Sequence, residues 1–180
     1  MDIANKENGI VIGTGDMSEL ALGWYTYNGN HMSMYAVNSG VPKTLVRYLV
    51  DACGESDTGV KDILADICQT EISPELLPPD ESGCIAQKTE HIIGKYDLHD
   101  FFLYHFLRNR YAKDKILALV TIAFPQVPTE EIKKTMDIFM KRFISQQFKR
   151  SCMPDGPKVG TVSLSPRGDL RIPSDISFPG

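Results

Sequence analysis

The sequence lacks the cysteine and histidine patterns that mark the common metal sites. Its four cysteines, Cys53, Cys68, Cys84 and Cys152, form no Cys-x-x-Cys pair, and its four histidines form no His-Glu-x-x-His motif. It also has no apolar run near the ~20 residues of a membrane helix and no signal-peptide pattern. These absences argue against a dedicated zinc site and favour reduced thiols in a cytoplasmic protein over a disulfide framework.

The sequence also lacks a strong excess of charge of either sign. It has 19 Lys and Arg against 23 Asp and Glu, for a net charge of −4 and a pI of about 5.5. Because no basic stripe is present, we expect neither nucleic acid nor a membrane as a partner. The length of 180 residues with 42% hydrophobic content suits one domain.

The first half of the chain predicts one strand among several helices. "MDIANKENG" reads as the end of a helix that stops at Asn8-Gly9. "GIVIGTG" is apolar in the way of buried parallel strands, and Met17 to Gly23 reads as a short helix. Pro42 suits the first position of a helix over "KTLVRYLVDAC", and "GVKDILADICQT" predicts another.

The second half predicts helices and then an extended arm. Asp97 is a candidate cap for "LHDFFLYHFLRNRY", "KDKILALVTIAF" is a compact apolar helix, and Thr129 is a candidate cap for the next. Apolar side chains recur there at helical spacing and predict a core: Ile132, Met136, Phe139, Phe143 and Phe148. After Arg150 the many prolines and glycines predict a short hairpin or an arm wrapped around a partner.

One parallel strand cannot form a sheet alone. We therefore expect either a mostly helical body with one or two parallel strands or an α/β sheet whose other strands are absent from this sequence. We divide the chain at residue 150, into a body (1–150) and the C-terminal arm (151–180).

The stretch "VIGTGDMSELALGW" combines a strand, a glycine turn and a helix start. Backbone N–H groups at such a turn can face an anion, helped by the helix dipole. The Thr14 hydroxyl can contact phosphate or adenine. A carboxylate at Glu19 can hold Mg²⁺ beside phosphate oxygens, or can be a solvated helix acid. Asp16 can do the same or only cap the helix, and the glycine turn alone is a weak motif.

Longer segments show which family this stretch resembles. "GTGDMSELALGWYTYNGNHMSMYAVNSGVPKTLVRYLV", "SPELLP", "IAQKTEHIIGKYDLHDFFLYHFLR" and "QQFKRSCMPDGPKVGTVSLSPRGDLRIPSD" resemble, in order, the synthetase domain of glutamine-dependent NAD⁺ synthetases. The resemblance implies the adenine-nucleotide α-hydrolase-like (ATP-pyrophosphatase) fold, a doubly wound parallel sheet. It implies conversion of deamido-NAD⁺ to NAD⁺ through an adenylate made from MgATP. Ammonia, free or from glutamine, then displaces AMP.

The resemblance also implies roles at the ATP site. Thr14 is similar to the family's threonine there, and Glu19 to a Mg²⁺ ligand. Lys43 is similar to a phosphate-binding lysine that is catalytic because it neutralises charge on the leaving pyrophosphate. A merely solvated Lys43 would oppose the helix dipole. Ser73, in "ISPELLP", is similar to a hydroxyl in a loop over the phosphates.

For deamido-NAD⁺ the resemblance implies the rings of Trp24, Tyr25 and Tyr27, which can stack on nicotinate or pack at a subunit interface. Asn30 stands where the family usually has Asp, so a cation-binding role there is in doubt. Lys149, with the neighbouring Arg150, is similar to a basic pair that can meet substrate; a solvated helix end is the alternative. The family implies a dimer or larger homo-oligomer.

The family's phosphate loop, Ser-Gly-Gly-x-Asp-Ser, is absent from these 180 residues, as is the glutaminase domain. We therefore expect the other half of the nucleotide site to lie upstream of Met1 and the isolated chain to be inactive. Two alternatives stay open: a non-catalytic helical dimerisation or nucleotide-binding module, and another ATP-pyrophosphatase ligase such as a GMP or asparagine synthetase. The C-terminal arm argues against the latter.

Overall fold

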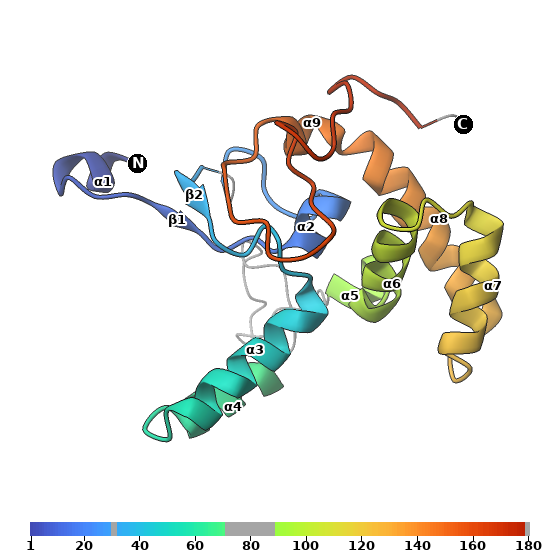
Figure 1. Cartoon of the computed structure of the whole chain (residues 1–180), viewed down its shortest axis with the longest axis horizontal. Coiled ribbons are helices and arrows are strands. Elements are labelled where there is room, and N and C mark those ends of the chain that lie inside the picture. The colour runs from blue at the N-terminus through green and yellow to red at the C-terminus, as the bar shows by residue number, and fades with distance from the viewer. Residues whose placement is uncertain (30–31, 71–88, 179–180) are drawn as a thin grey trace, which may run out of the picture.

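The structure, a computed structural model, describes residues 1–29, 32–70 and 89–178 (Figure 1). Helices dominate these ranges, as the sequence predicts. The elements in chain order are α1 (Asp2–Lys6), β1 (Ile12–Gly13), α2 (Met17–Leu22), β2 (Tyr35–Ala36), α3 (Lys43–Ser56), α4 (Lys61–Gln69), α5 (Thr89–Ile93), α6 (Tyr96–Leu107), α7 (Lys113–Ala123), α8 (Thr129–Ser145) and α9 (Gln147–Ser151). None of the helices in the described ranges is long and apolar enough to cross a membrane.

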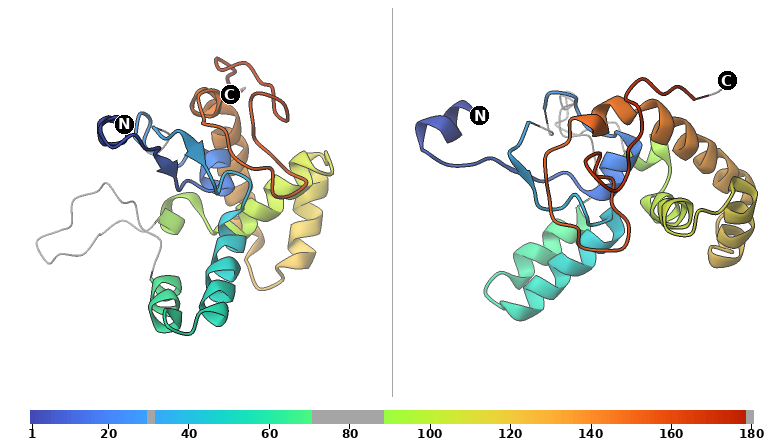
Figure 2. Two further views of the ribbon diagram at one scale, coloured as in Figure 1. Left: turned by 60° about the vertical axis from the view of Figure 1, so that its left-hand side comes forward. Right: turned by 45° about the horizontal axis from the view of Figure 1, so that its top comes forward.

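The core lies where α2 meets the group formed by α6, α7 and α8. Figure 2 shows the hairpin of α3 and α4 projecting away from the rest of the molecule, while the start of α3 contacts both α2 and α6. The four predicted core residues of α8, Ile132, Met136, Phe139 and Phe143, are buried. The prediction for Phe148 is wrong: this residue belongs to α9 and is 41% exposed, because the chain bends after Ser145.

The sheet is smaller and more exposed than the apolar run "GIVIGTG" predicts. β1 pairs in parallel with β2, with Ile12 opposite Tyr35 and Gly13 opposite Ala36. Ile12 is 45% exposed, because β1 has only this one neighbouring strand among the described residues. The prediction of one or two parallel strands is thus confirmed, and the prediction that this strand is buried is wrong.

The ends of α2 are determined by the residues next to them in the sequence. α2 starts with a capping box between Asp16 and Glu19 and ends at Gly23 in the left-handed conformation, at φ 57°.

The predictions of Asp97 and Thr129 as helix caps are wrong. α6 starts after Lys95, and the carboxylate of Glu90 accepts the backbone N–H of Tyr96 at 3.2 Å. α8 starts at Thr129 itself, after Pro128. Pro42 is likewise the residue before α3, whose first residue is Lys43.

The C-terminal arm packs against the body of the same chain. Residues 152–178 contain no strand, so the expected hairpin is not found there. Met153, Val162 and Leu164 are buried in the core, and the backbone N–H of Ala36 donates to the carbonyl of Asp155 at 2.8 Å. The arm therefore covers β2 and the core of its own chain.

Candidate functional site

The centre of the candidate site is an ammonium group held between two carboxylates. Lys43 Nζ lies 2.8 Å from Asp16 Oδ2 and 2.7 Å from Glu19 Oε1. The Asp16 side chain is 4% exposed, and those of Glu19 and Lys43 are 20% and 21% exposed. We call these three residues the charge cluster. Glu19 and Lys43 were both predicted to lie at the ATP site, and the structure brings them into contact.

Local sequence explains how the cluster forms. Glu19 donates its backbone N–H to Asp16 Oδ1 at 2.9 Å, and Glu19 Oε2 accepts the N–H of Asp16 at 3.2 Å. This capping box fixes both carboxylates at the N-terminus of α2. The backbone N–H of Met17 donates to the carbonyl of Val41 at 2.9 Å, which holds the start of α3 beside the start of α2. Lys43, the first residue of α3, therefore reaches both acids.

The electrostatics of the cluster favour a second cation. Burial raises the pKa of Glu19, as does the charge of Asp16, and Lys43 offsets only part of this. Burial alone would lower the pKa of Lys43, but the two carboxylates together outweigh it and raise that pKa. Two acids and one ammonium leave a net charge of −1 in a partly desolvated place. A cation approaching these oxygens is attracted.

The oxygen donors of the cluster fit Mg²⁺ in part. Mg²⁺ prefers oxygen ligands and is commonly held by one or two carboxylates together with substrate phosphates and water. Asp16 and Glu19 supply two such carboxylates, aimed at one point. Among the described residues, no group of three or more Asp, Glu, His or Cys side chains is placed to hold a metal. The remaining ligands would therefore be phosphate and water oxygens.

A third carboxylate, that of Asp100 in α6, contacts residues next to the cluster in α2 and α3. It accepts hydrogen bonds from the Ser18 hydroxyl and from the N–H and hydroxyl of Thr44, at 3.0 and 2.7 Å for the latter two. Burial raises the pKa of Asp100, and these hydrogen bonds act against that rise. Sequence reasoning missed this residue. The available signal was one acid within the largely aromatic and apolar run "LHDFFLYHF".

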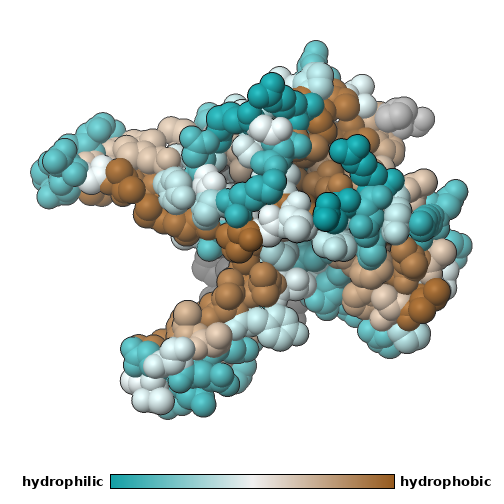
Figure 3. Space-filling view, viewed as in Figure 1, coloured by the Kyte–Doolittle hydropathy of each residue, from teal (hydrophilic) through white to brown (hydrophobic). Residues whose placement is uncertain are grey.

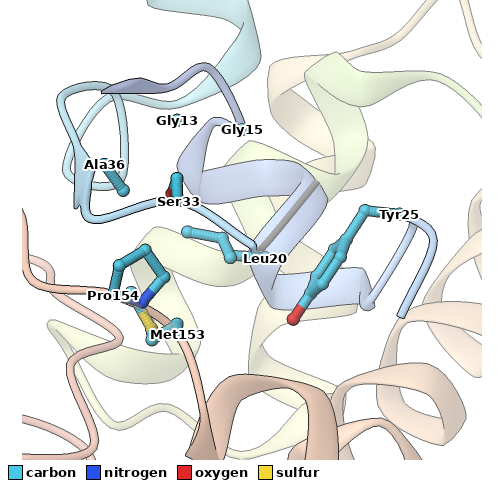
Figure 4. Close-up of a pocket in the computed structure, with 8 residues that line it drawn as sticks. All are labelled: Gly13, Gly15, Leu20, Tyr25, Ser33, Ala36, Met153 and Pro154. Carbon is cyan, nitrogen blue, oxygen red and sulfur yellow. The ribbon is translucent and has the colours of Figure 1, made fainter. Parts of the chain in front are cut away.

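The glycine turn lies beside a small pocket. Thr14 is exposed, and its carbonyl accepts a 3.5 Å hydrogen bond from Asn38. The residues around the pocket come from β1, α2, β2, the segments that join them, and the arm (Figure 4): Gly13, Gly15, Leu20, Tyr25, Ser33, Ala36, Met153 and Pro154. Its enclosed volume of about 20 Å³ has room for about one water molecule. This pocket by itself therefore does not enclose a nucleotide.

The aromatic residues after α2 lie against the end of α8 and against α9. The guanidinium of Arg142 sits over the Trp24 ring at 4.8 Å, and the ring of Tyr27 lies 5.5 Å from that of Phe148. Lys149 Nζ donates to the carbonyls of Gly23 and Tyr25, both at 2.8 Å. The structure thus brings Lys149 to the aromatic segment with which it was grouped.

Arg150 has a different place from either of the two expected for it. Its side chain is 0% exposed, so it is not a solvated helix end. The guanidinium donates to the carbonyls of Ala21 at 2.7 Å and Leu20 at 3.4 Å in α2, and to that of Phe143 in α8. Arg150 therefore ties the C-terminus of α2 to α8. Asn30 and Ser73 lie outside the described residues.

Two adjacent helix N-termini, those of α2 and α3, thus surround three charged side chains beside the short parallel sheet. The described fold resembles a solved glutamine-dependent NAD⁺ synthetase from Cytophaga hutchinsonii, with a TM-score of 0.75 and 16% sequence identity. The match covers 96% of this chain and 25% of that one.

Sequence comparison gives the family. Residues 1–152 match the NAD synthase family, so this chain belongs to it. Glutamine-dependent NAD⁺ synthetases from Mycobacterium tuberculosis and Mycobacterium leprae are 43% identical to it over 97% of its length. The one from Acinetobacter baylyi is 26% identical over 92%. The chain spans 29% of the length of the mycobacterial relatives and 27% of the Acinetobacter one.

Proposed function

We propose that this chain supplies the C-terminal part of the synthetase domain of an ATP-dependent amidating ligase that converts deamido-NAD⁺ to NAD⁺. Family membership and the mycobacterial relatives support this proposal. The observation that carries it is the charge cluster: a lysine and two acids held together at the N-termini of α2 and α3. Residues 1–150 form the body of this part and residues 151–180 its arm.

In the proposed reaction, a carboxylate oxygen of nicotinate attacks the α-phosphorus of ATP and pyrophosphate leaves. Ammonia then attacks the adenylated carboxyl carbon and AMP leaves. Lys43 is catalytic because its ammonium neutralises negative charge that builds on the leaving pyrophosphate. In the structure the ammonium is held by Asp16 and Glu19. To contact phosphate oxygens, it gives up one of these two carboxylates. Thr14 binds ATP with its exposed hydroxyl, and Ser73 is proposed to act on the phosphates.

Glu19 would hold Mg²⁺ together with phosphate oxygens, and Asp16 stands beside it. The metal would supply positive charge that orients the triphosphate and stabilises the leaving group. The chain's own contribution is the capping box, which fixes the direction of the Glu19 carboxylate before any ligand binds. The net negative charge of the cluster supports this assignment, since it attracts a divalent cation.

For deamido-NAD⁺ we propose the aromatic segment Trp24, Tyr25 and Tyr27 together with Lys149 and Asn30. Both ring faces of an aromatic side chain can stack on the flat nicotinate. The hydrogen bond from Lys149 Nζ to the carbonyl of Tyr25 supports this grouping, because it keeps the ammonium beside the aromatic segment. We further propose a doubly wound α-hydrolase-like parent fold, a cytoplasmic location and a homo-oligomer. Glutamine or free ammonia is the proposed nitrogen source.

The charge cluster can be tested on the chain as it stands, by titrating MgATP into isotope-labelled protein and following the backbone amide signals. The proposal predicts shifts confined to residues around Thr14, Glu19 and Lys43. Affinity should be weak, with a Kd of about 1 mM or higher, since the described pocket does not enclose a nucleotide. Lys43→Ala should abolish these shifts, whereas the exposed control Lys113→Ala should not.

Two results would count against the proposal. Shifts that persist unchanged in Lys43→Ala would place the phosphates elsewhere on the chain. A complete lack of shifts at these residues at 20–30 times the expected ~1 mM would favour the alternative, a helical module without a nucleotide site.

A further inference from the structure

We propose that Asp100 is a positioning residue that fixes Lys43 through Ser18 and Thr44. The significance of this for catalysis rests on the proposed function, but the placement of Lys43 can be measured without any nucleotide. The argument starts from a gap at the N-terminus of α3.

The first turn of α3 has no capping side chain of its own. Pro42 occupies the cap position and carries no side-chain acceptor. The carbonyl of Pro42 accepts the N–H groups of Leu45 and Val46, at 2.9 and 3.1 Å, so those two donors are satisfied within the helix. The N–H groups of Lys43 and Thr44 remain, and N–H groups left unpaired at this partly buried helix start would be costly.

Two other helices supply the missing acceptors. Ser18 Oγ, from α2, accepts the N–H of Lys43 at 2.8 Å, and Asp100 Oδ2, from α6, accepts the N–H of Thr44 at 3.0 Å. The Ser18 hydroxyl in turn donates to Asp100 Oδ1. One carboxylate thus fixes both N–H groups, one directly and the other through a hydroxyl, and locks the start of α3 against α2.

This lock bears directly on the charge cluster. Asp16 and Glu19 belong to the N-terminus of α2, as does Ser18, whereas Lys43 belongs to α3. The relative position of the two helix starts therefore determines whether the ammonium meets both carboxylates. Asp100 has no cation of its own among the hydrogen bonds and ion pairs of the described residues. The positive ends of two helix dipoles compensate its charge instead.

A merely stabilising role for Asp100 and a positioning role differ in what they do to Lys43. Lysine ammonium protons that are held by carboxylates exchange slowly with water and give a resolvable ¹H–¹⁵N signal. We would label the 180-residue chain with ¹⁵N-lysine, assign the signal by its loss in Lys43→Arg, and measure its exchange rate at neutral pH. Asp100→Asn keeps the shape of the side chain and removes its charge.

The proposal predicts that Asp100→Asn accelerates exchange at Lys43 by about tenfold or more and shifts its signal. The matched control is Asp97→Asn, which removes one acid from the first turn of the same helix at an exposed position. This control should leave the Lys43 signal unchanged. Asp100→Glu, which keeps the charge, should restore part of the slow exchange at Lys43.

A folded Asp100→Asn protein with a lower Tm but an unchanged Lys43 signal would overturn the proposal, because Asp100 would then only stabilise the fold. Ser18→Ala covers the case in which Asp100→Asn does not fold, since it removes only the hydroxyl between Asp100 and the N–H of Lys43. An unaltered Lys43 signal in Ser18→Ala would also overturn the proposal. If Lys43 responds as expected but MgATP does not bind, the proposed function fails while the positioning role stands.

Discussion

At the scale of single residues, the buried polar groups divide between the site and the scaffold. Asp16, Ser18 and Asp100 serve the charge cluster. Arg150, by contrast, is fully buried and donates to three backbone carbonyls and to the side-chain oxygen of Gln147. A basic residue beside a predicted substrate-binding lysine can therefore be structural, and sequence alone does not distinguish the two.

His99 belongs to the scaffold and gives the fold a pH dependence. Its Nε2–H donates to the carbonyl of Ile93 at 2.8 Å, its Nδ1 has no hydrogen-bond partner among the described residues, and it is 1% exposed. Burial lowers its pKa from 6.5 to about 4. Between these values the unfolded chain binds a proton that the folded chain does not, so the free energy of unfolding falls as the pH decreases.

The shift predicts a loss of about 3 kcal/mol between pH 7 and pH 4, from 1.36 kcal/mol per pH unit. His99→Gln, whose amide can still donate to Ile93, should remove this part of the pH dependence in denaturant titrations. The control His91→Gln, at an exposed position, should keep it. A full pH dependence in His99→Gln would assign the effect to another group.

At the scale of elements, α2 is the short helix on which the site depends. Six residues are too few for a stable helix in isolation. The capping box satisfies one end, and three cations from α8 and α9, Arg142, Lys149 and Arg150, satisfy carbonyls at the other. These cations also complement the negative end of the helix dipole.

Gly23 is the single residue whose change should break the end of α2. Its φ of 57° costs an L-residue about 1–2 kcal/mol, and an added Cβ would overlap the Gln146 side chain. Gly23→Ala should therefore lower the free energy of unfolding by more than ~1 kcal/mol, measured by denaturant unfolding. Gly160→Ala, where nothing lies within 4 Å, should be close to neutral. Equal effects of the two variants would contradict this account of the helix end.

The helices could be predicted from sequence because their apolar spacing is local. The starts of α6 and α8 were not, since Asp97 and Thr129 are plausible caps by composition while the observed helix starts use other residues. Glu19 was a candidate from the strand, glycine turn and helix start alone, whereas Lys43 was found through the resemblance to a family motif. Asp100 was missed because its partners, Ser18 and Thr44, are 82 and 56 residues away in the sequence.

At the scale of the whole molecule, apolar surface remains exposed around the two-stranded sheet. Figure 3 shows apolar side chains on the β1 segment and along α3. Ile10 and Ile12 are 65% and 45% exposed, and β1 has one free edge among the described residues. Exposed strands with apolar side chains tend to pair with other chains.

We therefore expect the isolated chain to self-associate as its concentration rises. Sedimentation velocity should show this, and Ile10→Lys or Ile12→Lys should weaken it. Ile122→Lys is the control, because Ile122 is 77% exposed on α7, away from the sheet. Self-association that responds only to Ile122→Lys would locate the contact on α7.

The central claim, that this chain supplies a working part of an NAD⁺ synthetase, is tested most directly by a chimera. The matching segment of the Mycobacterium tuberculosis relative, which is 43% identical, would be replaced by these 180 residues, and NAD⁺ formation from MgATP, deamido-NAD⁺ and ammonium would be followed. The account predicts turnover, with Lys43→Ala or Glu19→Ala reducing kcat/KM about 10²–10³-fold and Lys113→Ala leaving it unchanged. A folded chimera without turnover, or one in which Lys43→Ala keeps the full rate, would contradict it.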